Sequence, residues 1–220
     1  MKIRRKLGLV AASALLFSGS VGAVTMTSGD TATILWGGIY DGATLSASAT
    51  FTLTSLSETE ALFQVSVANT TAAGQPGRNR LVSFGITDIA PNITGAEALN
   101  NGVGDQWTAV IDTTFPGFQT VELCIWAGRN CAGGGTGGLV EGESDSFQLR
   151  LIGSFADVIS LGDPFPSKWQ SVGNTGQSVE FGGCTEGRCG SGSSVPEPGP
   201  LALFALGLVG LSLRKRTKFQ

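Results

Sequence analysis

The most constraining feature of this 220-residue chain is a strict alternation of apolar and polar side chains between residues 45 and 54. Successive side chains of a β-strand point to opposite faces, so a period of two places every apolar member on one face. That face consists of Leu45, Ala47, Ala49, Phe51 and Leu53. A strand that is apolar on one side has to bury that side against a second layer. The stretch therefore predicts a packed β protein.

The same period of two recurs in several further stretches of the chain. The clearest lie at residues 61–67, 82–86, 147–151 and 179–181, and weaker candidates lie at 33–40, 107–111, 121–126 and 155–159. The first two runs, joined through residues 55–60, predict a hairpin or neighbouring strands of one sheet. Eight or nine short strands separated by Gly, Asn and Pro favour an all-β fold over residues 24–190. We expect a two-sheet antiparallel sandwich that resembles a jelly roll.

The first 23 residues have the three zones of a secretory signal peptide. A basic start at residues 2–6 precedes an apolar core at 7–17, and small residues end the segment at Ala23. Signal peptidase is expected to cut after Ala23. The pair Arg4 and Arg5 alone is weak evidence for the twin-arginine route, so general secretion is favoured.

The charge of the exported part differs from that of the whole chain. Residues 24–213 contain six basic and seventeen acidic side chains, a formal charge of −11, whereas the whole chain has −3. Binding to nucleic acid or to anionic lipid requires basic groups that displace counterions. The acidic composition therefore disfavours nucleic acid and anionic lipid as partners and leaves divalent cations and neutral glycans.

The C-terminal 26 residues combine a proline-flanked acid, an apolar run and a basic end. Pro196, Glu197 and Pro198 follow a Gly/Ser linker at residues 191–194, and the apolar run covers residues 201–213. Thirteen residues are short for a membrane span, which needs about 20. The basic end, formed by Arg214, Lys215 and Arg216, predicts a transmembrane helix with its N-terminus outside the cytoplasm. Alternatives are an ordinary membrane anchor and a buried amphipathic helix.

This order of segments within residues 195–220 resembles the sorting tail of the PEP-CTERM exoproteins of Gram-negative bacteria. The resemblance implies recognition of Pro196, Glu197 and Pro198 by exosortase, a membrane transpeptidase. It also implies transient anchoring in the inner membrane through the 201–213 helix, with the basic end as a membrane stop. The expected destination is the cell surface or the extracellular matrix.

Four cysteines in the exported part form two local groups, Cys124 with Cys131 and Cys184 with Cys189. An even number in an oxidising compartment favours disulfides, although four cysteines permit three connectivities. Local pairing is favoured because turn-forming residues separate the members of each group. A four-cysteine zinc site usually has tighter spacing. A catalytic thiol is less favoured still, since the chain contains no histidine.

Residues 123–139 and the strand that follows them to residue 147 resemble the cistern family, a group within the PEP-CTERM exoproteins. The likeness rests on the cysteine loop, the glycine run and the following strand. It implies no catalytic residue. We expect the glycine run at residues 133–138 to be a flexible connection, because the lysine and hydroxyl residue of a phosphate-binding loop are missing after it.

Other candidate sites are less specific. Glu141, Glu143 and Asp145, with Asp157 or Asp163, could bind Ca²⁺ through oxygen ligands, but the spacing matches no known calcium loop, so a solvated loop is favoured. A hydrolase would need two facing carboxyl groups, which a sequence cannot show. A glycan-binding platform could use aromatic residues if they are exposed. Its candidate members are Trp36, Tyr40, Trp107, Trp126 and Trp169.

The function that follows is that of a non-catalytic extracellular protein associated with exopolysaccharide or the biofilm matrix. It is expected to have no catalytic residue and no cofactor, with Ca²⁺ as a minor alternative. A lectin-like glycan-binding module and a hydrolase of an extracellular polymer are the alternative functions. Exosortase and signal peptidase are expected as processing partners, with extracellular polysaccharide as a further partner.

Overall fold

The computed structural model describes residues 22–99 and 106–189, which form thirteen β-strands and no α-helix. Most of the predicted signal peptide, the linker at 191–194 and the tail at 195–220 lie outside the described residues. Among the residues that are described, nothing helical is long and apolar enough to traverse a membrane. The predicted 201–213 helix therefore stays a prediction.

Most of the described connections between strands are short, and the longest of them, residues 128–143, joins β9 to β10. In chain order they are β1 Ala23–Met26, β2 Thr31–Tyr40, β3 Ala43–Leu56, β4 Glu60–Asn69, β5 Gly77–Ile86, β6 Asp88–Ala90, β7 Ile93–Leu99, β8 Trp107–Thr114, β9 Thr120–Ala127, β10 Ser144–Gly153, β11 Ile159–Gly162, β12 Phe165–Val172 and β13 Gln177–Thr185.

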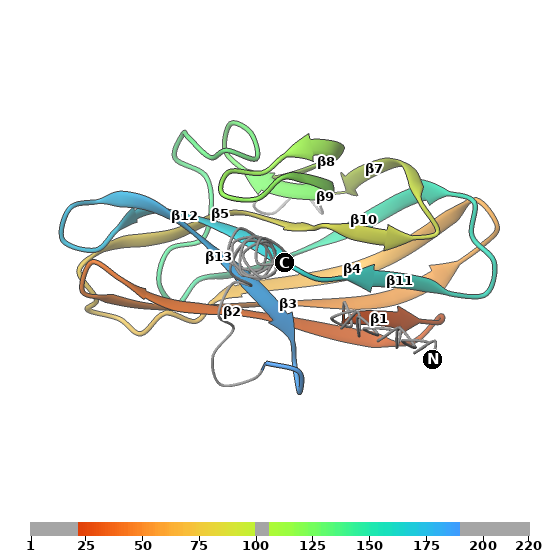
Figure 1. The fold of residues 1–220 in the computed structure, drawn as a ribbon, viewed down its shortest axis with the longest axis horizontal. Helices are drawn as coiled ribbons and strands as arrows, with labels where there is room; N and C mark the ends of the chain where they lie inside the picture. Colours follow the sequence, from red (N-terminus) through yellow and green to blue (C-terminus); the bar gives the residue numbers. More distant parts are fainter. Residues whose placement is uncertain (1–21, 100–105, 190–220) are drawn as a thin grey trace, which may run out of the picture.

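Ten of these strands form one large sheet in the order β7-β10-β4-β3-β2-β13-β12-β5-β9-β8, and a second sheet has the order β1-β11-β6. All named neighbours pair antiparallel. The end strands β7 and β8 of the large sheet lie next to each other, so this sheet is nearly closed (Figure 1). The all-β prediction and the presence of two sheets are confirmed.

The larger sheet contributes strands to both layers around the core, whereas each sheet of the predicted jelly-roll sandwich would form one layer. Strand β13 pairs with β12 along most of its length and then with β2 at Cys184 and Thr185. This exchange of partners connects the β2-β3-β4-β10 layer to the β12-β5-β9-β8 layer within one hydrogen-bonded sheet. The two layers that enclose the core are therefore continuous.

Aromatic rings fill the centre of this curled sheet. Phe84 on β5 lies with its ring centroid 5.5 Å from that of Trp36, 6.4 Å from that of Phe51 and 5.5 Å from that of Trp107. Trp107 stacks on Phe147 of β10 at 5.7 Å. The predicted inward faces of residues 45–53, 61–67 and 147–151 all lie in this core. The core therefore forms where the period of two predicted it.

Strand β5 departs from the predicted pattern at Val82. Leu81, Phe84 and Ile86 belong to the main core, and Val82, although buried, does not. A register shift between Lys168 and Trp169 on the neighbouring strand β12 marks an irregularity at this point. A bulge inserts an extra residue and so reverses which side chains face inward. The prediction that Val82 shares a face with Phe84 is therefore wrong.

The predicted strand at 155–159 is also wrong, because only Ile159 belongs to a strand there. Phe155 is buried and donates its backbone N–H to the Glu58 carbonyl, so it anchors a loop. Strands β1, β6, β7, β11 and β12 were not predicted. Several are very short, and β12 contains Pro166, a residue that usually argues against an interior strand.

Two turns at one end of the molecule are joined through Asp41. The β2–β3 turn and the β12–β13 turn lie together at the left of Figure 1. Asp41 Oδ2 accepts hydrogen bonds from Thr175 N at 2.6 Å and from Thr175 Oγ1 at 2.7 Å. These bonds hold the pKa of the Asp41 carboxyl below its ordinary value of 3.8. The charged carboxylate therefore stabilises the junction of the two turns.

We expect an Asp41→Asn variant to melt at a lower temperature than the unchanged protein at pH 7. Asparagine tolerates the positive φ of 47° at this position but carries no charge to strengthen the bonds from Thr175. Because the pKa of Asp41 is lower in the folded state than the ordinary 3.8, its charged carboxylate stabilises the fold above pH 3.8. This stabilisation is lost as the pH falls through the pKa of the folded state. The difference should therefore vanish in acid. Thermal unfolding followed by circular dichroism between pH 7 and 2 measures it, and a constant difference would contradict the assignment.

Candidate functional site

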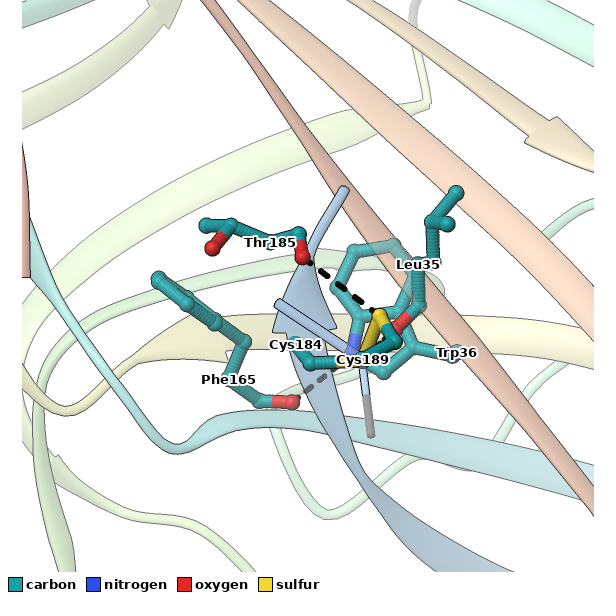
Figure 2. The surroundings of a disulfide bond; sticks show 6 residues. All are labelled: Leu35, Trp36, Phe165, Cys184, Thr185 and Cys189. Carbon is teal, nitrogen blue, oxygen red and sulfur yellow. Dashed lines mark hydrogen bonds between the residues drawn. A yellow bond between two sulfur atoms is a disulfide. The ribbon is translucent and has the colours of Figure 1, made fainter. Parts of the chain in front are cut away.

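The predicted pairing of Cys184 with Cys189 is present at the end of β13. The two Cα atoms are 5.3 Å apart and the sulfurs are bonded. Figure 2 shows the bridge beside Trp36, whose Nε1 donates to the Phe165 carbonyl at 2.7 Å. Cys184 also pairs with Leu35 of β2. The bridge therefore links the last paired residues of β13 to the point where the described part of the chain ends.

The first described residues contact this same region. Arg188 donates from a guanidinium nitrogen to the Ala23 carbonyl at 3.1 Å, and Gly22 N donates to Asp163 Oδ1 at 3.1 Å. Ala23 also pairs with Gly162 in the small sheet. We call Gly22, Ala23, Asp163 and residues 185–189 the stalk end. Both ends of the described chain leave the body there.

The predicted pairing of Cys124 with Cys131 is present as well, with the Cα atoms 6.2 Å apart. Both cysteines lie with Phe115 and Val121 in a small apolar cluster separate from the main core. Ser83 Oγ donates to the Cys131 carbonyl at 2.9 Å. This bridge therefore fixes a loop over the outer side of β5 and β9, and all four cysteines are paired.

The glycine run at 133–138 is packed, which corrects the expectation of a flexible connection. A Cβ added to Gly138 would lie 2.4 Å from the Leu81 carbonyl oxygen, and one added to Gly137 would lie 2.7 Å from Gly128 N. Leu139 exchanges two backbone hydrogen bonds with Leu81, each 2.9 Å long. Side chains are excluded here because backbone lies against backbone. The glycines thus allow the segment to cover β5.

Three of the acidic residues proposed as Ca²⁺ ligands accept hydrogen bonds from different partners. Glu141 accepts a hydrogen bond from Asn79, Glu143 accepts one from Val140 N, and Asp145 Oδ2 accepts from Trp107 Nε1 at 2.9 Å. Within the ranges 22–99 and 106–189, no three Asp, Glu, Cys or His side chains are grouped so that they could hold a metal ion. The structure does not bring the predicted ligands together.

The aromatic residues proposed for glycan stacking are divided between core and surface. Trp36, Trp107 and Trp169 are buried with at most 3% of their surface exposed, whereas Trp126 and Tyr40 are half-buried. An interior tryptophan cannot stack on a sugar ring. The predicted platform therefore lacks three of its five members.

One carboxylate that the sequence did not single out has a clear structural role. The two carboxylate oxygens of Glu122 accept hydrogen bonds from Ile89 N at 2.6 Å and from Ile93 N at 3.0 Å. These contacts hold β6 and the first residue of β7 against β9. The sequence named Asp163 only as a candidate Ca²⁺ ligand, and no local signal predicts the contacts of Glu122, Asp163 or Arg188, because their partners are distant in the chain.

The fold and the two oxidised bridges define a disulfide-containing β protein suited to an oxidising compartment. Residues 194–216 match the model of the PEP-CTERM protein-sorting motif, which includes the predicted Pro196, Glu197 and Pro198 and the basic residues Arg214 to Arg216. No curated protein and no solved structure matches the chain. The motif supports a secreted, surface-directed protein that is processed by exosortase.

Proposed function

We propose that this protein is a non-catalytic extracellular component that exosortase sorts and that associates with exopolysaccharide or the biofilm matrix. The match at residues 194–216 carries the proposal. We also propose that the protein belongs to the cistern family. This assignment rests on the cysteine loop and glycine run described above. We further propose that the body acts without a cofactor.

The body has properties that suit such a role. Aromatic side chains fill its centre, and both disulfides close short loops outside the main core cluster. A loop-entropy estimate assigns about 2 to 2.5 kcal/mol to a bridge closing a loop of either length. The body's acidic composition disfavours adsorption to anionic surfaces. These features favour a stable, soluble unit delivered by its tail.

In this proposal, exosortase recognises the tail of the protein and not its body. From the sequence, we expect Pro196 and Pro198 to restrict the backbone around Glu197 and to favour an extended conformation there. The 201–213 helix would hold the protein in the inner membrane until processing, with Arg214, Lys215 and Arg216 on the cytoplasmic side. The catalytic groups of the processing step belong to exosortase.

The matrix assignment is tested in a host that carries exosortase, with and without synthesis of exopolysaccharide. We expect the mature protein in the matrix fraction of the first strain and in the free medium of the second. Intact mass should show loss of residues 1–23 and of the basic end, and a decrease of about 2 Da per bridge relative to the reduced form. An identical distribution in both strains would contradict the matrix assignment without affecting the sorting assignment.

A further inference from the structure

We propose that the glycine run at residues 133–138 forms, together with Arg80 and Arg129, a site that binds the carboxylate of an acidic sugar. We take the exopolysaccharide of the proposed function as the partner, so the inference rests on that function. It adds the surface of the body that makes the contact and the chemical group that is recognised. The cysteine loop and the glycine run thereby receive a role beyond packing.

The first observation concerns the basic side chains of the body. Six of them lie among the described residues. Arg150 and Lys168 form ion pairs with glutamates, and Arg188 lies at the stalk end. In an acidic body, arginines without a carboxylate partner are the groups best able to accept an external anion. Those that form no ion pair within the ranges 22–99 and 106–189 and lie away from the stalk end are Arg78, Arg80 and Arg129.

Arg80 is held against one end of the glycine run. Its Nη1 donates to the Thr136 carbonyl and, at 3.5 Å, to the Gly137 carbonyl. A Cβ added to Gly138 would lie 3.1 Å from Arg80 Cγ, so this side chain crosses the run closely. A guanidinium group has five N–H donors in one plane, and these contacts use only one of its nitrogens. The remaining donors are left for a ligand.

Arg129 lies against the other end of the run. A Cβ added to Gly134 would lie 3.6 Å from Arg129 Cβ and 3.7 Å from its Cδ, so the aliphatic part of the arginine packs along the glycine. The side chain of Arg129 is exposed. Gly134 and Thr136, where the two arginines contact the run, have Cα atoms no more than about 8 Å apart. Two guanidinium groups are therefore carried on one short stretch of backbone.

The run also presents backbone N–H groups. Gly133 N donates to the Asn130 carbonyl at 2.9 Å, and Gly138 N donates to Gln106 Oε1 at 3.1 Å. The amides between them, those of residues 134–137, donate no hydrogen bond to another part of the chain that the structure describes. Consecutive N–H groups in a turn can form a concave binding site for an anion. The run therefore supplies further donors beside the two arginines.

The backbone that carries both arginines is fixed. Arg129 lies inside the loop that the Cys124–Cys131 bridge closes. Arg80 directly precedes Leu81, which exchanges two backbone hydrogen bonds with the residue after the run. A site that already has its binding shape loses less conformational freedom when a ligand binds. The bridge and the packed glycines therefore favour binding by positioning the two arginines in advance.

The chemistry of the site favours isolated negative charges on a largely neutral polymer. The planar guanidinium group matches the planar carboxylate and binds it through two parallel hydrogen bonds. The rest of the body is acidic, with a formal charge of −11 over residues 24–213, so a polymer with closely spaced charges is repelled. A polysaccharide in which neutral sugars separate the acidic ones avoids most of this repulsion. We therefore expect uronic acid residues within such a chain to be the ligands.

The test is a titration of isotope-labelled full-length protein in a non-ionic detergent with glucuronate, and with glucose and inorganic sulfate for comparison. At low ionic strength, glucuronate should shift the amide resonances of residues 134–137 with a Kd of about 1 mM, and glucose should not. Arg129→Gln and Arg80→Gln should each weaken binding about tenfold. The absence of a shift with about 50 mM glucuronate, or shifts with sulfate alone, would overturn the inference.

Arg188→Gln is the matched control, because it removes one exposed arginine at the stalk end and leaves the glycine run unchanged. Its Kd for glucuronate should stay within about twofold of that of the unchanged protein. The melting temperature is measured for every variant. Because the side chain of Arg129 is exposed, Arg129→Gln tests the site even if Arg80→Gln disturbs the run. Equal weakening by Arg188→Gln and Arg129→Gln would indicate a general effect of charge and would contradict a local site.

The double variant Arg80→Gln, Arg129→Gln separates this inference from the proposed function. In the strain that makes exopolysaccharide, it should move from the matrix fraction to the free medium, whereas Arg188→Gln should remain in the matrix. If the unchanged protein depends on exopolysaccharide and the double variant is retained equally well, the matrix assignment stands and the site fails. If glucuronate binds through the two arginines but the unchanged protein is distributed identically with and without exopolysaccharide, the site stands and the matrix assignment fails.

Discussion

A Glu197→Ala variant is expected to remain in the membrane fraction with a normally folded body. Its release should fall by about 100-fold, which corresponds to about 2.7 kcal/mol of lost transition-state stabilisation. The physical reason is that alanine removes the one carboxylate between Pro196 and Pro198. Residue 197 lies outside the residues that the structure describes, 22–99 and 106–189. Cell fractionation with quantitative immunoblotting measures the effect.

Glu186→Ala is the matched control for this experiment. Glu186 is an exposed acid at the stalk end, outside the matched motif, and its substitution should leave release within about twofold. Intact mass should show the unprocessed basic end on the retained Glu197→Ala protein. Normal release of that variant with a processed tail would count against recognition of the motif.

A Phe84→Ala variant is expected to lose about 3 to 5 kcal/mol of the free energy of unfolding. Phe84 is fully buried, and its ring contacts Trp36, Phe51 and Trp107, which come from three other strands. Truncation removes these contacts and leaves a cavity between the two layers. Urea unfolding of the oxidised body, followed by tryptophan fluorescence, measures the loss.

Ile39→Ala is the control for the core variant. Ile39 is 78% exposed at the end of β2, so its truncation should change the unfolding free energy by no more than about 0.5 kcal/mol. A loss below about 1 kcal/mol for Phe84→Ala would be incompatible with its place at the centre of the core. Release through the tail should be unaffected by Ile39→Ala.

The fold was predictable where one face of a strand is apolar over many residues. Strands β3, β4 and β10 follow the period of two closely, because each has one face in the core and the other in contact with polar surroundings. The prediction failed at Val82, where a bulge reverses the alternation. It also failed for β12, which is buried on both faces and contains a proline.

The candidate site was predictable in its covalent parts. The two local disulfides follow from spacing, turn-forming residues and an oxidising compartment. The role of the glycine run was not predictable, because close contact between its backbone and that of β5 depends on how distant segments pack. The alternative calcium ligands are not grouped among the described residues, since spacing along a chain does not make three carboxylates converge.

The sequence by itself determined the class of the body and the presence of a sorting motif, and it favoured the local pairing of the cysteines that the structure shows. All three depend on short-range information, namely side-chain alternation, small loops and a contiguous stretch of residues. Only the tertiary structure decided that the large sheet nearly closes and that Gly22 and Arg188 lie at one end. Those features depend on contacts such as Gly22 with Asp163, which are more than one hundred residues apart in the chain and leave no local pattern.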